Sequence, residues 1–221
     1  MKVDLWEFES ALAHEGYAKI AGIDEAGRGP LAGPVVSAAV ILPADFEAGG
    51  VTDSKQLSPR KREKWFEYIY AHARAIGIGI VDAFEIDRIN ILQAAKLSMA
   101  MALENLDPEP DFVLIDGNFT IQTPLPQRPI VKGDSRSISI AAASIVAKVS
   151  RDRLMLRYHD DFPNFGFDRH KGYPTKAHKA AIAVHGPCPI HRRTFRGVAE
   201  HLTTPESPDA LENGVEAHDR A

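Results

Sequence analysis

The order of apolar and polar positions along the chain predicts strands interleaved with helices. Short apolar or alternating runs bounded by turn residues indicate strands at residues 17–24, 34–42, 75–81, 111–116 and 129–132. Apolar residues that recur every three or four positions indicate helices at residues 5–15, 59–73, 82–106, 135–158 and 175–185. Because strands that alternate with helices are typical of layered α/β proteins, we expect a five-stranded mixed sheet flanked by helices, with a C-terminal helical extension.

Capping residues support three of these helix starts. Ser58 and Pro59 suit the N-cap and the first turn of the second helix. Asp82 with Glu85 three residues later resembles a capping pair, and Thr175 can cap the last helix. The segment that begins at Asp82 is expected to form one helical stretch that serves packing.

Length and composition are those of one globular domain. With 221 residues and 44% hydrophobic content, the chain can bury a single substantial core. We expect that domain to occupy residues 1–202. Residues 203–221 contain two prolines, few bulky side chains and excess acid, so we expect a disordered acidic tail there.

The sequence contains no segment that indicates a membrane or an oxidising compartment. No run approaches the roughly 18 consecutive apolar residues that span a bilayer, and the first ten residues lack the apolar stretch of a secretory signal. The single cysteine, Cys188, excludes an internal disulfide and a thiolate zinc cage, and we interpret it as structural. We expect a cytoplasmic protein.

Charge is spread unevenly along the chain, whose formal net charge is −4. Residues 1–127 hold 11 Lys/Arg against 19 Asp/Glu, a net −8, whereas residues 128–196 hold 14 against 5, a net +9. A basic segment beside an acidic half suits a protein that grips a phosphate backbone with one part and holds a metal ion with another. Solvated helix faces are the alternative explanation.

Four acidic residues follow three of the predicted strands: Asp24, Glu25, Asp116 and Asp134. Each alone could be a helix cap or a loop residue, but strand ends converge at one edge of a sheet. Clustered carboxylates raise one another's pKa unless a cation lies among them, which favours a metal site. Since adjacent side chains on a regular strand point to opposite faces, Asp24 and Glu25 can share that site only if the strand ends or bulges there.

The ligand types indicate which metal such a site would hold. Carboxylates without a cysteine or an obvious histidine pair favour the hard ions Mg²⁺ or Mn²⁺ over zinc. Ions of this kind commonly act on phosphodiesters in pairs about 3.5–4 Å apart.

Polar segments near the acids could contact a nucleic acid. The turn Gly27-Arg28-Gly29 offers a cation and exposed backbone N–H groups, although an ordinary tight turn would have the same residues. The hydroxyls and ammonium of residues 52–55 suit a phosphate contact, although a simple polar loop is the alternative. A third group consists of four basic residues expected on a solvated helix face, namely Lys148, Arg151, Arg153 and Arg157.

Several longer motifs resemble those of bacterial ribonuclease HII, in the order in which that family has them. They begin with residues 23–34, Ile-Asp-Glu-Ala-Gly-Arg-Gly-Pro-Leu-Ala-Gly-Pro. They continue with Asp53-Ser54-Lys55, Ile115-Asp116-Gly117, Lys132-Gly133-Asp134-Ser135, the segment at residues 141–149, and His170-Lys171-Gly172-Tyr173. The resemblance covers roughly residues 18–197, and such long ordered blocks are highly specific.

The resemblance implies a ribonuclease H-like fold and a metal-dependent endonuclease, with Asp24, Glu25, Asp116 and Asp134 holding Mn²⁺ or Mg²⁺, two ions when substrate is bound. The substrate would be an RNA–DNA hybrid or duplex DNA with embedded ribonucleotides, cut to leave a 3′-hydroxyl and a 5′-phosphate. The implied substrate contacts are Gly27, Arg28, Gly29, Ser54, Lys55, Lys148 and Tyr173. Among these, Gly27 to Gly29 would sense the ribose 2′-hydroxyl, and Tyr173 would meet the sugar at an RNA–DNA junction.

One position departs from the family pattern. Pro174 follows Tyr173 where the family usually has glycine, and proline biases Tyr173 toward an extended backbone. Apart from the resemblance, a core aromatic that precedes a helix is the simpler explanation of Tyr173.

Other classes of protein fit the sequence less well. A phosphatase with an aspartate nucleophile usually has two aspartates spaced by one residue after its first strand, and Asp24-Glu25-Ala26 lacks them. A type 3 ribonuclease H is expected to carry a longer N-terminal segment. A non-catalytic module that binds RNA–DNA hybrids remains the alternative. We expect a monomer, and the sequence does not decide whether the protein docks on a replication clamp.

Overall fold

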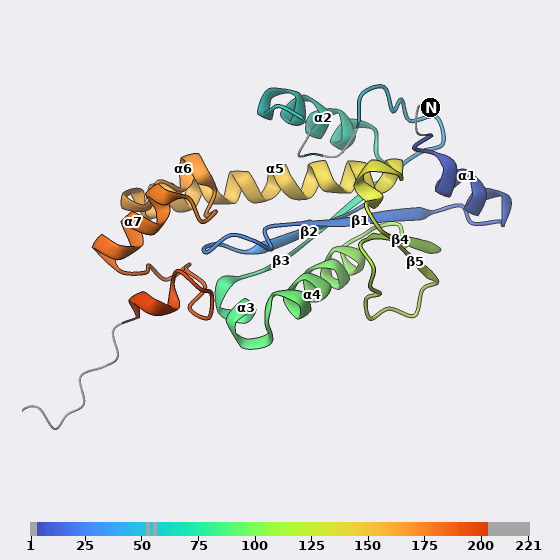
Figure 1. The fold of residues 1–221 in the computed structure, drawn as a ribbon. Helices are drawn as coiled ribbons and strands as arrows, with labels where there is room; N and C mark the ends of the chain where they lie inside the picture. The colour runs from blue at the N-terminus through green and yellow to red at the C-terminus, as the bar shows by residue number, and fades with distance from the viewer. Residues whose placement is uncertain (1–3, 52–53, 55–56, 203–221) are drawn as a thin grey trace, which may run out of the picture.

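The fold is built on a five-stranded mixed sheet (Figure 1), as predicted. The computed structural model describes residues 4–51, 54 and 57–202. Its strands are β1 (Ile20–Ala26), β2 (Val35–Ile41), β3 (Ala75–Val81), β4 (Phe112–Asp116) and β5 (Gln127–Ile130). They lie in the order β3-β2-β1-β4-β5. The pairs β1–β2 and β2–β3 are antiparallel, while β1–β4 and β4–β5 are parallel.

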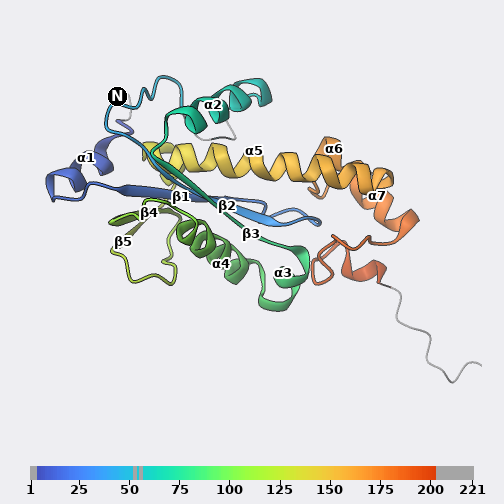
Figure 2. The same ribbon diagram turned by 180° about the vertical axis from the view of Figure 1, so that it is seen from behind.

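Helices cover both faces of this sheet (Figures 1 and 2). The α-helices are α1 (Glu7–His14), α2 (Pro59–His72), α3 (Ala83–Ile89), α4 (Ile91–Glu104), α5 (Ile138–Asp161), α6 (Phe167–His170) and α7 (Lys176–His185). Short 3₁₀ turns are η2 (Gly133–Ser135), η3 (Pro163–Phe165) and η4 (Ala199–His201). Helix α5 packs on β1 and β2 with α2 outside it, and α4 packs on the opposite face.

The first half of α5 lies unusually close to β1 because both elements have small residues at the contact. A Cβ atom on Gly22 would lie 2.2 Å from the backbone carbon of Ser139, so only glycine fits there. Residues 141–143 of α5 are three buried alanines that continue this contact. The close approach brings the buried N-terminal half of α5 beside the acidic end of β1.

The helix predicted over residues 82–106 is in fact two helices, so that prediction was wrong in one respect. Asn90 interrupts it with a φ of 70°, a left-handed value that asparagine tolerates better than most residues. The Asn90 side chain then accepts hydrogen bonds from the backbone N–H groups of Leu92 and Gln93, at 3.0 and 3.1 Å, and starts α4.

The bounds of β1 and β5 differ most from their predictions, and β1 begins at Ile20, three residues later than predicted. β1 continues through Glu25 to Ala26, and the regular register with β2 extends over both acidic residues. The strand was predicted to end at Asp24, and it ends two residues later, directly after Glu25. β5 begins two residues earlier than predicted and ends at Ile130, because Lys132 takes a left-handed φ of 57° and starts η2.

The C-terminal helical extension forms a small core of its own around the far end of α5. Apolar side chains from the β1–β2 connection, α5 and the C-terminal segments meet there: Leu31, Ala32, Met155, Phe165, Phe167, Ile182 and Val198. None of the helices in the described residues has both the length and the apolar character that a bilayer span requires. The tail predicted over residues 203–221 lies outside the described residues.

Candidate metal centre and its surroundings

Three of the four predicted acids meet at one edge of the sheet. Asp24 lies on β1, Asp116 is the last residue of β4, and Asp134 lies in η2. The parallel register of β1 and β4 pairs Ile23 with Ile115, which brings the next residue of each strand side by side. One carboxylate oxygen from each of the three aspartates lies within 4.8 Å of the others. The sequence prediction that these acids converge is confirmed.

Asp116 also builds the turn that presents Asp134. Its Oδ1 atom accepts hydrogen bonds from the backbone N–H groups of Gly133, at 2.6 Å, and Asp134, at 3.4 Å. A Cβ atom on Gly133 would lie 2.6 Å from Cδ1 of Ile140, so glycine lets the turn sit against α5. One carboxylate thus fixes the backbone that carries the second.

Asp24 is the most deeply buried of the three aspartates, with 4% of its surface exposed. Burial, and then the negative charges of Glu25 and Asp116, raise the pKa of Asp24 well above its usual value. A hydrogen bond with the Ser144 side chain opposes this rise. An ionised carboxylate only accepts, so the Ser144 hydroxyl donates this hydrogen bond, and the Ser54 hydroxyl lies 2.9 Å from that of Ser144.

Glu25 is not one of the three residues whose carboxylate oxygens lie within 4.8 Å of one another, but its charge acts on Asp24 and the charge of Asp116 acts on it, so it borders the group. Its Oε1 atom lies 3.3 Å from Nη1 of Arg28. Its Oε2 atom is buried and has no hydrogen-bond partner among the described residues. Burial raises the pKa of Glu25 even though Arg28 lowers it, and the nearby charge of Asp116 adds to the rise.

The donor set fits a hard divalent cation. Within the described residues, the group holds only carboxylates, the ligands that Mg²⁺ and Mn²⁺ prefer. The unpartnered oxygen of Glu25 and the mutual repulsion at Asp24 are both features that a cation would relieve.

Two buried arginines hold the connection between β1 and β2, which contains the Gly27-Arg28-Gly29 turn. Arg192 donates to the carbonyl oxygens of Gly27 and Arg28, at 2.6 and 3.0 Å, and to that of Gly33, at 2.9 and 3.0 Å. Arg151 donates to the carbonyls of three further loop residues, Ala32, Pro34 and Lys171. With a φ of 104°, Gly27 leaves no room for a side chain, because a Cβ atom there would lie 2.2 Å from Nε of Arg151.

The burial of these two arginines was not predicted from the sequence. Arg151 was expected on a solvated helix face, yet both Arg151 and Arg192 are completely buried. Burial lowers the pKa of Arg151 to about 10 and that of Arg192 to about 9. Sequence reasoning missed Arg192 as a site residue, because an isolated arginine in a loop carries no periodic signal and its partners lie 159 to 165 residues earlier.

Tyr173 lies beside the glycine turn, not in the core. Its side chain is 41% exposed, which contradicts the explanation of a core aromatic. A Cβ atom on Gly29 would lie 3.8 Å from Cε1 of Tyr173, so the ring flanks the turn. The Nζ atom of Lys148 lies 5.8 Å from the centre of the same ring.

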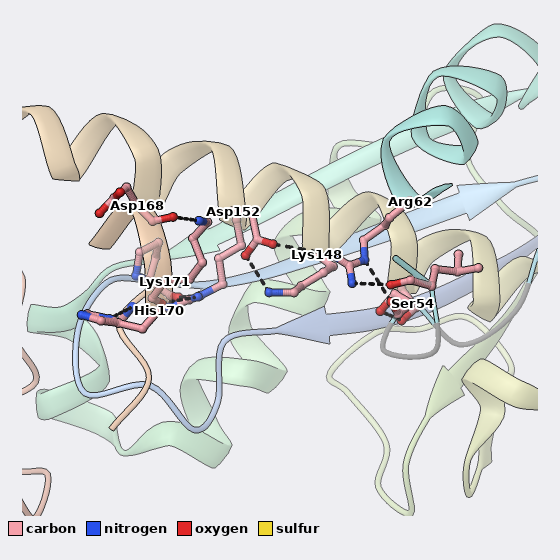
Figure 3. A network of polar contacts seen from close by, with 12 residues as sticks. Ser54, Arg62, Lys148, Asp152, Asp168, His170 and Lys171 are labelled. Atoms are coloured by element: carbon pink, nitrogen blue, oxygen red, sulfur yellow. Dashed lines mark hydrogen bonds and ion pairs between the residues drawn. The ribbon is translucent and has the colours of Figure 1, made fainter. Parts of the chain in front are cut away.

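A polar network connects Ser54 with Arg62 on α2 and with Asp152 and Lys148 on α5 (Figure 3). Arg62 donates to the carbonyls of Ser54, at 2.9 Å, and Leu57, at 3.0 Å, and its Nη1 lies 3.8 Å from Asp152. Asp152 also accepts a 2.6 Å hydrogen bond from Lys148. The network therefore joins two predicted substrate contacts, Ser54 and Lys148, through α2 and α5.

The same side chains border an open groove of about 450 Å³. Its basic and aromatic lining residues are Arg62, Lys148, Arg153, Arg169, His170, Lys171 and Tyr173. Arg153 is paired there with Glu63. Of the two predicted phosphate contacts in residues 52–55, Ser54 is buried, and Lys55 lies outside the described residues.

Solved structures share this fold. The ribonuclease H2 from Pyrococcus horikoshii OT3 matches with a TM-score of 0.70 at 28% identity, over 83% of this chain and 96% of that one. The RNase HII of the PCNA:RNase HII complex from Archaeoglobus fulgidus matches with a TM-score of 0.69, also at 28% identity, over 87% and 99%. The sheet and its acidic edge define a ribonuclease H-like, metal-dependent endonuclease.

Sequence comparison specifies the family. The family model of ribonuclease HII matches residues 21–198. The Ribonuclease HII of Geobacter metallireducens is 59% identical over 198 residues, which are 90% of this chain and 93% of that protein. The chain belongs to the ribonuclease HII family, and it cleaves the RNA strand of RNA–DNA hybrids. The alternative of a non-catalytic binding module is therefore wrong.

Proposed function

We propose that this enzyme, besides cutting hybrids, cuts duplex DNA at single embedded ribonucleotides, with Mg²⁺ or Mn²⁺ held by Asp24, Glu25, Asp116 and Asp134. The observation that carries the proposal is the meeting of three carboxylates within 4.8 Å next to a glycine turn flanked by an exposed tyrosine. The three carboxylates suit phosphodiester hydrolysis, and the glycine turn with its tyrosine suits recognition of a sugar.

The acids have distinct tasks in this proposal. Asp24, Asp116 and Asp134 supply the converging oxygens, and Glu25 supplies a buried oxygen that has no hydrogen-bond partner in the described part of the chain. Two bound ions would activate water and stabilise the leaving oxygen, giving a 3′-hydroxyl and a 5′-phosphate. Ser144 holds Asp24 by a hydrogen bond, and the Ser54 hydroxyl in turn contacts that of Ser144.

Recognition of RNA must rest on the 2′-hydroxyl, because that group distinguishes the two sugars. Arg151 fills the side-chain position of Gly27, but a Cβ atom on Gly29 would meet only the Tyr173 ring at 3.8 Å, so a ribose can approach the backbone of the turn at Gly29. Tyr173 offers a flat exposed ring beside it, and Lys148 places a cation over that ring. Beyond these, the basic groove suits a phosphate backbone. Contacts from Ser54 and Lys55 remain predictions.

The proposal is tested by mapping cut sites on duplexes that carry one, four or many consecutive ribonucleotides, with Mg²⁺ or Mn²⁺ supplied separately. We expect cleavage of all three duplexes, with a 3′-hydroxyl and a 5′-phosphate at each cut. Cleavage of the long hybrid without cleavage at a single ribonucleotide would overturn the second activity.

Tyr173→Ala is expected to depress cleavage at a single embedded ribonucleotide while leaving thermal stability nearly unchanged, because the ring is exposed. Tyr173→Phe keeps the ring and loses the hydroxyl, which is worth about 0.5–1.5 kcal/mol if it makes one ordinary hydrogen bond. The Phe variant should therefore retain part of the activity. Kinetics and thermal unfolding of both variants check this, and activity lost only in proportion to unfolding would contradict it.

Hybrid affinity is expected to fall steeply with salt, because each phosphate contact releases counterions. The log–log slope should be about −0.9 per contact, as on B-form DNA. Arg169→Gln removes one exposed cation of the groove and should make the slope less negative by about one contact. Fluorescence anisotropy in Ca²⁺ at several salt concentrations measures both, and an affinity indifferent to salt would exclude the groove from the interface.

A further inference from the structure

Two buried histidines outside the metal centre touch each other end to end. The Nε2 atoms of His178, on α7, and His191, in the C-terminal loop, are 3.0 Å apart. His178 is 0% exposed and His191 is 2% exposed. At the far side of the pair, Nδ1 of His178 lies 2.9 Å from the Tyr173 carbonyl oxygen, and Nδ1 of His191 lies 2.9 Å from the backbone N of Cys188.

The groups at the two ends fix where the protons lie. The N–H group of Cys188 can only donate, so Nδ1 of His191 is unprotonated and the ring of neutral His191 carries its proton on Nε2. The carbonyl of Tyr173 can only accept, so Nδ1 of His178 carries the proton and Nε2 is free to accept. The two rings thus form one directed chain of hydrogen bonds from Cys188 to Tyr173.

This chain of hydrogen bonds joins the two backbone segments that flank the proposed position of the ribose. One end is the backbone of Tyr173, whose ring lies beside Gly29. The other end is the segment of residues 188–192, which forms a bridge between His191 and Ala32 and continues into Arg192. Arg192 in turn holds the carbonyls of the glycine turn.

We propose that His178 and His191 are positioning residues that set the distance between the Tyr173 ring and the Gly27-Arg28-Gly29 turn, and so determine specificity for a ribonucleotide at an RNA–DNA junction. This inference rests on the function proposed above for Tyr173. Neither histidine touches substrate. Each acts by holding a backbone segment that does.

The surroundings of the two histidines keep both rings neutral, as the chain of hydrogen bonds requires. Burial lowers the pKa of each histidine to about 4. The nearest other titratable groups are His170, stacked on His178 with ring centres 4.4 Å apart, and the Cys188 thiol, 3.0 Å from Nδ1 of His191. Phe165 and Phe167 pack edge-on or tilted against His191 and exclude water from it.

The proton arrangement is testable by ¹⁵N NMR of the imidazole rings in the full chain at pH 7.5. We expect His178 to be protonated at Nδ1 and His191 at Nε2, two opposite tautomers within one contact. Finding both rings in the same tautomer, or either of them doubly protonated, would overturn the chain of hydrogen bonds and the proposal with it.

Two substitutions at His178 separate its hydrogen bond with Tyr173 from its hydrogen bond with His191. His178→Asn places an amide where Nδ1 was, so it keeps the bond to the Tyr173 carbonyl and loses His191. His178→Gln places its amide near Nε2, so it keeps His191 and loses Tyr173. His185→Asn, an exposed histidine on the same helix, is the matched control. The readouts are kcat and KM on a single embedded ribonucleotide and on a long hybrid, with thermal unfolding.

A displacement of about 1 Å at a positioning contact can cost on the order of 100-fold in rate. Because each His178 variant keeps one of the two hydrogen bonds, we expect a smaller effect, with the single ribonucleotide cut about tenfold more slowly relative to the long hybrid. The His185 variant should show no such change. If Tyr173→Ala shifts this ratio and neither His178 variant does, the inference fails alone. If Tyr173→Ala leaves the ratio unchanged, the proposed role of Tyr173 fails as well. Loss of both activities in proportion to unfolding would reduce the pair to a structural contact.

Discussion

Asp24→Asn is expected to abolish cleavage of every substrate while the protein remains folded. Removal of one carboxylate from a group whose oxygens lie within 4.8 Å weakens the hold on a divalent cation. A bound ion contributes several kcal/mol of transition-state stabilisation, and about 3 kcal/mol corresponds to roughly 100-fold in rate. Asp116→Asn and Asp134→Asn should behave alike. Single-turnover cleavage at saturating Mn²⁺ measures the loss.

The same substitution is expected to raise thermal stability in the chelated protein. Burial and neighbouring charges raise the pKa of Asp24 above its unfolded value. A carboxyl of this kind lowers the free energy of unfolding as the pH rises from its unfolded pKa to its folded pKa. Below its unfolded pKa it has no effect on that free energy. Asp24→Asn should therefore unfold at a higher temperature than the parent at pH 8 with EDTA, and the difference should vanish in acid.

A matched control is Glu104→Gln, which removes an exposed carboxylate at the end of α4. It should change neither cleavage nor stability. Glu25→Gln should lose activity as well, because its buried oxygen would otherwise face a cation. Near-normal cleavage by Asp24→Asn or Asp116→Asn at saturating metal would remove the acids from the reaction.

Much of this site could be predicted because its signals are local. Strand periodicity followed by an acid pointed to Asp116 and to the sheet edge where the acids meet. Capping residues such as Ser58 and Asp82 marked helix starts correctly, since each accepts from a backbone N–H three residues later. Local patterns also misled at Asn90, where the helical spacing of apolar residues continues across a break in the backbone.

What could not be predicted depends on partners distant in sequence. The surroundings of Glu25 are one example, because the Asp116 charge that acts on its carboxylate comes from a strand about 90 residues later in the sequence. His178 and His191 carry no pattern that distinguishes them from surface histidines. The role proposed for them depends on carbonyl and N–H groups that only the folded backbone places opposite the ring nitrogens.

Arg192→Met is expected to destabilise the protein by about 3 kcal/mol, because the carbonyls of Gly27, Arg28 and Gly33 lose their donors and each unsatisfied buried group costs about 1–3 kcal/mol. Relief of a buried charge offsets part of that cost. Cleavage at a single ribonucleotide should fall further than stability alone explains, because the turn would no longer be held.

Arg192→Lys tests whether charge or geometry matters. Lysine keeps the charge but is a compact ammonium, and it cannot reproduce a planar fork that donates to three carbonyls at once. We therefore expect Arg192→Lys to resemble Arg192→Met in chemical denaturation and in cleavage. Arg193→Met, which removes the exposed neighbouring arginine, should match the parent. If Arg192→Lys retained parental stability and specificity, a positive charge alone would suffice at this position, and the glycine turn would not need its carbonyls fixed.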